Sequence, residues 1–426
     1  MTIEAEIKKD KMHVFRRLYF KRRLSGGDYE TDWQQIPGRY VKGWGTISFN
    51  VDDAIPNFVR QGSLNLSLNN DDGFFSDVSE EKSFFFTAIT RYRTLVKIEA
   101  GYTAEDGTEF PTNPSLFVGI ITKDAKYKEN NLVNFSVMPL TQIFEEFPAD
   151  RLKGLTDSMT ASEILTNIRD HQQTATTTSY IFQKYISTGG WSFSTSSINY
   201  NFETSTTLEG KTTWKLIQDM AAAEGKVAYV DRLGDFYFAP RTASGTASYH
   251  FSGIGDREKT YGHNIIGGIQ VDDNVRKVFN RVKITFYTGT SDVSVTKNES
   301  WDWGDSSSSF YYGVHSFDYN NKLINSGFVA LAIANSIYDE FVWPKQEIQF
   351  NAKFVPMLDV EDRVSITYQT RRFEGGYIWG VNLWNQSFWS KREGYNILLN
   401  STTARIIRIQ HNLNNMTSRL VTRDVD

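Results

Sequence analysis

The 426-residue sequence contains no cysteine, and it also lacks long apolar runs. Without cysteine the chain forms neither disulfides nor thiolate nucleophiles, and most structural zinc sites are excluded. No stretch approaches the roughly 18 uncharged apolar residues of a membrane-spanning helix, so no membrane span is expected. The N-terminal segment MTIEAEIKKDKMHV has no apolar core and therefore does not indicate a secretory signal. These absences agree with assembly in a reducing cytoplasm.

Charge of neither sign dominates. The chain has 46 Lys and Arg against 50 Asp and Glu, and a net charge of −4 gives no general attraction to nucleic acid. Aromatic residues make up 14% of the sequence, which is typical of a folded protein rather than a disordered one. The length allows two or three domains, each with its own core.

Sequence motifs of catalysis and metal binding are missing as well. No two of the six histidines lie at metal-ligand spacing, and the zinc-protease, nucleophile-elbow, Walker and dinucleotide-binding motifs are absent. The run Asn69–Gly73 does not fit a calcium loop, because Leu68 would occupy the first ligand position. A turn at Asp72-Gly73 explains it better. We therefore predict that the protein is not an enzyme and has no catalytic, cofactor-binding or metal-binding residues.

Residues 1–150 have the pattern of an antiparallel β-barrel or sandwich. Apolar and polar residues alternate in 45–51 and 62–68, as they do in half-buried strands. Further strand-like runs lie at 95–101, 116–122 and 132–138.

Residues 151–275 combine helices with short strands. Thr160 and Glu163 form a capping box, which predicts a helix start. The segment 212–241 predicts a capped helix that ends at Gly225, followed by a β-hairpin. This helix–hairpin unit contains no obvious catalytic group, so we interpret it as a packing module.

Long strands restart at 275–287, and a helix is predicted at 326–342. The closing strands are expected at 347–354, 363–368 and 403–410. An insertion rich in Trp, Tyr, Phe and Gly occupies 371–396, between the last two of these strands.

Six aromatic residues are candidates for contacts with another molecule, because flat rings are enriched at interface cores and can stack on sugar faces. They are Trp301, Trp303, Tyr377, Trp379, Trp384 and Trp389. Whether the aromatic insertion contacts glycans or other subunits stays open at this point. Asp302 and Asp305 also suggest a glycosidase pair, but closeness in sequence does not fix the separation that such a pair requires.

The N-terminal basic residues have two explanations. They are Lys8, Lys9, Lys11, Arg16, Arg17, Lys21, Arg22 and Arg23. They suit either non-specific contact with nucleic acid or a strand that is solvated or forms salt bridges between subunits. We favour the second explanation, because it accounts for the charges equally well without a nucleic-acid partner.

The order of these pieces resembles the baseplate-hub or tail-tip hub proteins of tailed bacteriophages and related contractile machines. The order is SLNLSLNNDDGFFSD, TLVKIEAG, LFVGIIT, VNFSVMPLTQIF, TASEILTNI, TTWKLIQDMAAAEGKVAYVDRLGDFYFAPR, VFNRVKITF, a helix, LDVEDRVSITY and a last strand pair. The resemblance covers residues 13–426, and the succession carries it rather than any single motif.

The resemblance implies a mainly β protein with α+β insertions. Two tube-like antiparallel β-barrel domains, 1–150 and 276–426, would flank an intervening helix–hairpin domain at 151–275. Three such subunits would form a homotrimeric hub at the distal end of the tail tube, where paired barrels adapt sixfold to threefold symmetry and line part of the DNA channel. Since the sequence ends at Asp426, soon after its last expected strand, no wall-degrading appendage is expected.

The resemblance also implies partners and a location. The partners are the tail-tube or distal tail protein ring, the tape-measure protein, a central spike or fibre, and DNA in transient, non-specific passage. The location is the tail tip or baseplate of the virion, after assembly in the host cytoplasm. The alternative function is that of a carbohydrate-binding or receptor-binding tail protein.

Overall fold

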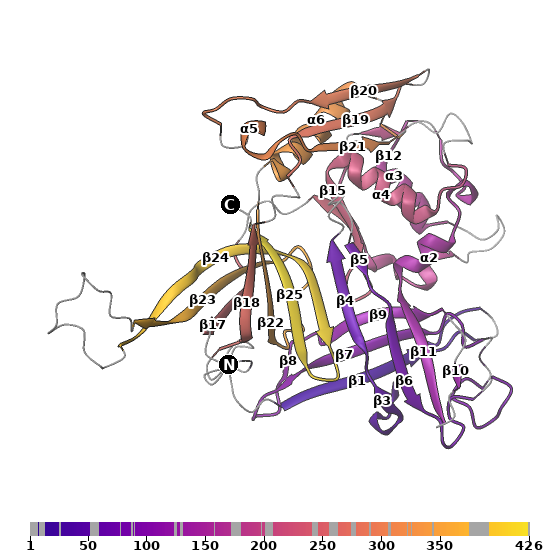
Figure 1. Ribbon diagram of the computed structural model, residues 1–426. Coiled ribbons are helices and arrows are strands. Elements are labelled where there is room, and N and C mark those ends of the chain that lie inside the picture. The colour runs from indigo at the N-terminus through magenta and orange to yellow at the C-terminus, as the bar shows by residue number, and fades with distance from the viewer. Residues whose placement is uncertain are drawn as a thin grey trace.

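The computed structural model is mainly β with helical insertions, which confirms the predicted fold class (Figure 1). The structure describes residues 7, 13–24, 27–51, 59–76, 78–86, 88, 90–122, 126–127, 131–156, 158–171, 180–196, 198–200, 208–240, 246–254, 263–273, 278–288, 291–305, 308–321, 323–324, 326–342, 345–374 and 392–424. Two large sheets lie next to each other, and the helices with three small sheets lie beyond them. Within these residues no helix is long and apolar enough to cross a membrane.

The first large sheet is formed by the N-terminal third of the chain. Its strands are β1 (His13–Lys21), β2 (Gln34–Ile36), β3 (Val41–Gly43), β6 (Leu64–Asn69), β7 (Leu95–Thr103), β8 (Glu109–Phe110), β9 (Ser115–Ile121), β10 (Lys126–Tyr127) and β11 (Leu132–Pro139). The order is β2-β1-β7-β9-β11-β6-β3, with antiparallel neighbours throughout. The end strands β2 and β3 are joined only by residues 37–40, which include the 3-10 turn η1 (Gly38–Tyr40), so the sheet must curve strongly.

The second large sheet draws on both ends of the chain. Its strands are β17 (Tyr249–Ile254), β18 (Ile265–Asp273), β22 (Gln346–Lys353), β23 (Arg363–Glu374), β24 (Arg392–Asn412), β25 (Thr417–Asp424), β4 (Thr46–Val51) and β5 (Val59–Gln61). The order is β17-β23-β24-β25-β22-β18, and β4 pairs with β24 and β5. One pair, β17 with β23, is parallel, whereas the sequence predicted antiparallel strands.

Strand pairing does not follow the segments expected from the sequence. β17 and β18 precede residue 276 but belong to the closing sheet, and β4 and β5 leave the first sheet for the second. The reason is that alternation shows which face of a strand is buried but not which strand lies beside it. The division into domains at residues 150 and 275 therefore stays a prediction.

Asn264 connects the two end strands of the second sheet. Its side chain is fully buried; its amide oxygen accepts a hydrogen bond from the Ser252 backbone N–H at 2.7 Å. Its amide nitrogen donates to the Tyr249 hydroxyl at 3.0 Å and to the His250 carbonyl at 2.9 Å. Because a single side chain replaces several backbone hydrogen bonds here, β17 stays beside β18 although the two strands do not form a regular ladder.

The helix–hairpin unit forms as the sequence predicts. Thr160 and Glu163 make the capping box of α3 (Ala161–Arg169). The Thr212 hydroxyl caps α4 (Thr213–Glu224), which ends at Gly225 in the left-handed conformation, with φ of 61°. The hairpin β15 (Lys226–Val230) and β16 (Phe236–Pro240) follows, and β13 (Trp191–Phe193) extends it. The remaining small elements of this part are α2 (Thr141–Glu146), β12 (Met159–Thr160), β14 (Asn199–Tyr200), η2 (Ala149–Arg151), η3 (Phe182–Lys184) and η4 (Thr188–Gly190).

A further small sheet packs with this unit rather than with the second large sheet. It consists of β19 (Arg281–Tyr287), β20 (Asp292–Lys297) and β21 (Ser316–Asn320), and α6 (Gly327–Phe341) covers it. A short helix, α5 (Ser309–Tyr312), lies in the connection between β20 and β21. The helix predicted at 326–342 is confirmed, but its sheet shares a core with α2, α3 and α4.

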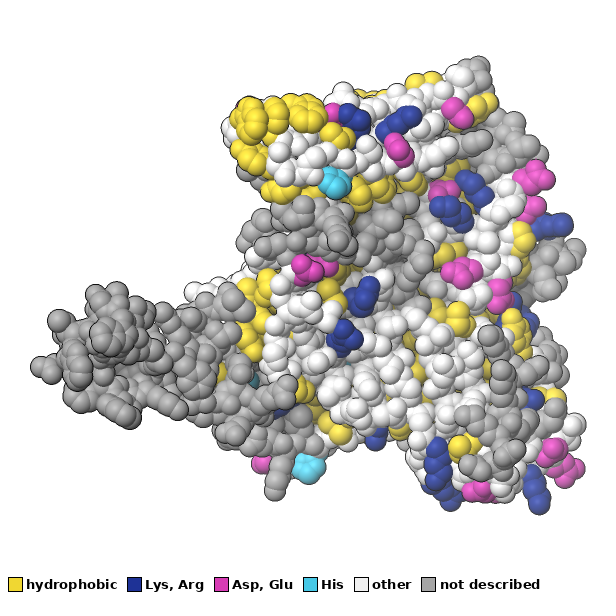
Figure 2. Space-filling view, viewed as in Figure 1, with side chains coloured by type: hydrophobic (Ala, Val, Ile, Leu, Met, Phe, Trp, Pro, Cys, Tyr) yellow, Lys and Arg dark blue, Asp and Glu magenta, His cyan; other side chains and the backbone are white. Residues whose placement is uncertain are grey.

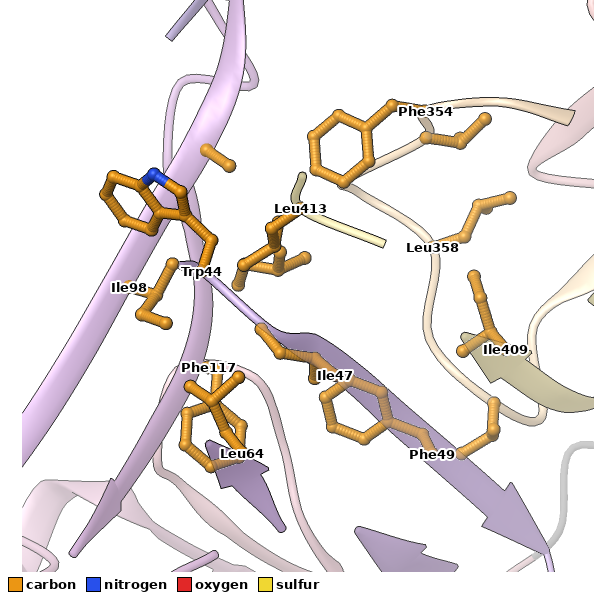
Figure 3. Close-up of a cluster of buried hydrophobic side chains, with 14 of the residues drawn as sticks. Trp44, Ile47, Phe49, Leu64, Ile98, Phe117, Phe354, Leu358, Ile409 and Leu413 are labelled. Atoms are coloured by element: carbon orange, nitrogen blue, oxygen red, sulfur yellow. The ribbon is translucent and has the colours of Figure 1, made fainter. Parts of the chain in front are cut away.

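The two large sheets share one hydrophobic core (Figure 3). Trp44, Ile47 and Phe49 lie between side chains of the first sheet, such as Phe117, and side chains in or next to strands of the second sheet, such as Phe354. The two sheets therefore pack as one body instead of being joined by a linker.

Candidate functional site

Two of the N-terminal basic residues, Arg17 and Arg22, pair with carboxylates within the chain. Lys8, Lys9 and Lys11 lie outside the described residues. Arg17 forms a salt bridge with Glu109 and lies 3.9 Å from a Glu99 carboxylate oxygen, and Arg22 donates to Glu30 at 2.9 Å. Arg16 donates to the Leu413 carbonyl at the end of β24. These contacts lie within one chain and leave less positive charge for nucleic acid, while salt bridges between subunits stay a prediction.

A second polar site joins the three main parts of the protein. Arg232 lies in the turn between β15 and β16, and its guanidinium donates to the Ser115 carbonyl at 2.7 Å and the Asn113 carbonyl at 3.2 Å, in and just before β9. The same side chain lies 3.3 Å from a carboxylate oxygen of Asp359, in the connection between β22 and β23. Arg232 thus connects the helix–hairpin unit to both large sheets.

The carboxylates around Arg232 are poorly solvated because they are buried. Desolvation raises the pKa of Asp359 to about 7 and that of Asp231 to about 6, and it also raises the pKa of Asp362. Arg232 opposes this rise at Asp359, because a nearby positive charge favours the ionised carboxylate. The cluster is a structural junction whose charge changes near neutral pH. The sequence analysis did not single out these residues, since they come from three distant segments.

Two of the six candidate aromatic residues lie in a compact exposed cluster. Trp303 stacks on Phe310 with ring centroids 3.9 Å apart and an interplanar angle of 11°. Trp301 meets the Phe310 ring edge-on, and Tyr311 meets the Trp303 ring edge-on. We call these four residues the aromatic platform. Phe310 and Tyr311 were not predicted, because their contact with Trp303 depends on how the loop folds back on itself.

The other four candidates lie outside the described residues. They are Tyr377, Trp379, Trp384 and Trp389. β23 and β24 pair as a long antiparallel hairpin from Arg363 with Arg405 as far as Glu374 with Arg392, so residues 371–374 and 392–396 of the predicted insertion belong to these strands. That hairpin projects from the second sheet in Figure 1. Its role as a subunit or glycan contact stays a prediction.

The possible acidic pair takes part in a turn. One carboxylate oxygen of Asp302 accepts a hydrogen bond from the Gly304 backbone N–H at 2.9 Å, and the backbone N–H of Asp305 donates to the Asp302 carbonyl at 3.2 Å. A local turn therefore explains Asp302 without a catalytic role. Among the described residues no group of three His, Asp or Glu side chains is arranged to hold a metal ion.

Two of the histidines, His411 and His171, have structural surroundings. His411 is fully buried, its ring contacts Phe354, and its Nδ1 lies 2.9 Å from the Ser418 hydroxyl. Desolvation lowers its pKa to about 3, so the ring stays neutral. Burial also lowers the pKa of His171. Neither ring has the partners of a catalytic base.

No protein-family model and no curated protein sequence matches the chain. Solved structures of tail proteins, however, are similar to it in fold. The tail protein from Neisseria meningitidis MC58 is 8% identical, with a TM-score of 0.52, and the match covers 97% of this chain and 96% of that one. The 43 kDa tail protein of prophage MuSo2 from Shewanella oneidensis is 13% identical, with a TM-score of 0.49, covering 96% and 99%. Prophage tail protein gp18 from Listeria monocytogenes EGD-e is 9% identical, with a TM-score of 0.48, covering 96% and 94%.

The first of these matches confirms the predicted resemblance at the level of the fold. It spans nearly the whole length of both chains, so the likeness is not confined to one β-sheet.

Proposed function

We propose that the protein is a structural subunit of a phage tail that forms a homotrimeric hub at the distal end of the tail tube. The observation that carries the proposal is the end-to-end likeness of its fold to the tail protein from Neisseria meningitidis. In this role it occupies the tail tip or baseplate of the virion after assembly in the host cytoplasm, and it acts mechanically rather than as an enzyme.

The arrangement of the two large sheets supports a symmetry-adapting role. A threefold ring matches a sixfold tube only if each subunit offers two comparable surfaces, so that three subunits present six. This chain carries two large curved sheets, and their separation is fixed because β4 crosses into the second sheet and pairs with β24. The tail-tube or distal tail protein ring is the partner that would contact these surfaces.

Direct contacts between the sheets hold the two surfaces at a constant angle. The Tyr102 hydroxyl on β7 donates to the Phe354 carbonyl just after β22. The Trp44 backbone N–H donates to the Asn414 side chain at 3.1 Å. A ring closes only when the angles between neighbouring contact surfaces are constant, and these bonds supply that constancy within one subunit.

The remaining partners are the tape-measure protein, a central spike or fibre, and DNA in transient passage. The pairing of Arg17 and Arg22 with carboxylates suits a channel through which DNA slides without being retained. Electrostatic binding requires unpaired cations that release counterions from phosphates.

The test is a cryo-electron microscopy reconstruction of the protein assembled with its tail-tube protein. The expected result is a ring of three copies with two large sheets of each copy facing six tube subunits. A ring with six copies, or a chain that joins no tail particle, would refute the hub. If the two large sheets of one chain do not superpose, the symmetry-adapting role alone is refuted.

A further inference from the structure

The aromatic platform is exposed at the outer end of the molecule, away from the two large sheets. The Trp303 side chain is 69% exposed, and Trp301, Phe310 and Tyr311 are exposed as well. In Figure 2 hydrophobic side chains gather at the end of the molecule where Figure 1 places α5. Exposed clusters of large rings are uncommon on protein surfaces and mark sites that bind another molecule.

The loop that carries the platform is fixed by buried polar contacts. The fully buried Asn280 donates to the Ser309 hydroxyl at 3.0 Å and the Gly313 carbonyl at 2.6 Å, and it accepts from the His315 backbone N–H at 2.8 Å. Ser308 is also fully buried, and its hydroxyl donates to the Ser300 carbonyl at 3.2 Å. Asn280 therefore anchors the C-terminal side of the loop next to β19, and the Ser308–Ser300 bond closes the loop on itself, so the rings are held in place before any ligand arrives.

An ion pair anchors the platform at its edge. Arg281 and Glu299 form a bidentate pair, and the hydrogen bonds from Arg281 lower the pKa of Glu299 to about 2. The Trp301 indole N–H donates to the same carboxylate at 3.2 Å. The orientation of Trp301 is thus set by a group that stays ionised over the physiological pH range.

The geometry leaves one flat ring surface open. Phe310 covers one face of the Trp303 indole, so the large exposed area belongs to the opposite face and the ring edge. The Tyr311 hydroxyl donates to the Trp303 carbonyl at 2.9 Å, which holds the Tyr311 ring upright beside the indole. A flat face with an upright ring beside it suits a flat, partly apolar ligand of similar width.

Charge around the rings narrows the class of ligand. Two carboxylates, of Glu299 and Asp302, lie beside the rings in the same loop, and Arg281 pairs with the first of them. The local negative charge repels phosphate backbones and acidic polymers. It also disfavours a protein interface core, where charged residues are depleted. A neutral sugar fits both properties, because its C–H face can lie on the indole while its hydroxyl groups donate to carboxylates.

We propose that the aromatic platform binds a neutral saccharide, with the open face of Trp303 as the stacking surface and Asp302 as an acceptor for sugar hydroxyls. This binding function goes beyond the structural role and does not depend on it. It gives the subunit a contact with a glycan in addition to its contacts within the tail.

The test uses the full-length protein on an array of immobilised neutral and acidic glycans, with affinities of the bound glycans measured by calorimetry. Wild-type protein is expected to bind neutral glycans. Trp303→Ala is expected to weaken that binding at least about tenfold, as for removal of one stacking ring. Trp303→Phe should retain part of it, and Asp302→Asn should reduce the discrimination against acidic glycans.

Phe328→Ala is the matched control, since Phe328 is 82% exposed on α6 and lies outside the platform. It should bind like the wild type, and thermal unfolding of all variants should coincide because every changed side chain is exposed. The proposal is overturned if no neutral glycan binds, or if Trp303→Ala binds as tightly as the wild type. A change in oligomeric state on Trp303→Ala without any glycan binding would also overturn it, in favour of a protein contact. The trimer is scored separately on the same samples, so its absence would count against the hub alone.

Discussion

Replacing Arg232 with Met should weaken the contacts between the helix–hairpin unit and the two large sheets, while keeping the unbranched part of the side chain. The variant removes two hydrogen bonds to the carbonyls of Asn113 and Ser115 and the ion pair with Asp359. The side chains of Arg232 and Asp359 are only 16% and 26% exposed, so water replaces these contacts incompletely. From the values for charged hydrogen bonds and partly buried ion pairs, we expect a loss of about 2–4 kcal/mol in the free energy of unfolding at pH 8.

The loss should depend on pH, and its sign follows from the raised carboxylate pKa values. The pKa of Asp359 is about 7 and that of Asp231 is about 6, so the folded protein binds these protons more tightly than the unfolded chain. Their contribution to stability is complete below about pH 4, the ordinary carboxyl range, and is lost as the pH rises through 6 to 7. Without Arg232 the pKa of Asp359 rises further, because the charge that favours its ionised form is gone.

The destabilisation by Arg232→Met should therefore be larger at pH 8 than at pH 5. At pH 5 Asp359 is already mostly protonated in both proteins, and only the carbonyl hydrogen bonds are lost, which amounts to about 1–2 kcal/mol. Urea denaturation at the two pH values measures both quantities. Introducing Arg232→Met into an Asp359→Asn background should give a smaller pH dependence of the difference, since the amide does not ionise. Asp231 and Asp362, whose pKa values Arg232 also lowers, account for the part that remains.

Arg419→Met is a suitable control, because Arg419 is exposed on β25 and its replacement should change stability little at either pH. An equal loss at pH 5 and pH 8 for Arg232→Met would refute the argument. That outcome would show either that Asp359 is ionised at both pH values or that Arg232 acts only through the carbonyls.

Three smaller substitutions probe single contacts, and urea denaturation measures each of them. Asn264→Leu should cost about 3 kcal/mol, because a fully buried amide that bonds β17 loses all of its partners; an unchanged midpoint would mean that β17 does not need this link. Gly225→Ala should cost about 1 kcal/mol through the left-handed backbone alone, since a methyl group there meets no atom within 4 Å; a larger loss would indicate a clash. Tyr102→Phe should cost about 1–2 kcal/mol by removing the hydroxyl that bonds the Phe354 carbonyl, and no loss would show that this bond does not stabilise the contact between the sheets.

Local chemistry made the helix–hairpin unit predictable. Thr160 with Glu163, and Thr212 with Gly225, mark helix ends through hydrogen bonds and backbone conformations that depend on a few neighbouring residues. The strands of the first sheet were likewise visible in their alternation, as in β11, where Val133, Phe135 and Val137 are fully buried.

Partners distant in sequence could not be predicted. Ile47 and Phe49 alternate with polar residues like any half-buried strand, yet they pair with His411 and Ile409 of β24. The same limit applies to the sites. Trp301 and Trp303 were identified by residue type, whereas the side chains that hold the platform, of Asn280, Arg281 and Glu299, come from positions with no distinctive local pattern. Arg232 was read only as part of a turn, because its charged partner is more than a hundred residues away in sequence.

β4 belongs to the first segment of the chain but pairs with β24 in the second sheet. This pairing bears on the proposed role, in which one chain supplies two tube-facing surfaces. If the two sheets were joined only by a flexible segment, the angle between their surfaces would vary, and three copies would close into rings of different geometry or not at all. Here a strand of the first segment completes the second sheet, and Trp44 and Phe49 fill the core between the sheets. Separating them would expose that core to water, which is costly for side chains of this size. The packing energy that folds the chain therefore also fixes the angle that the proposed ring requires.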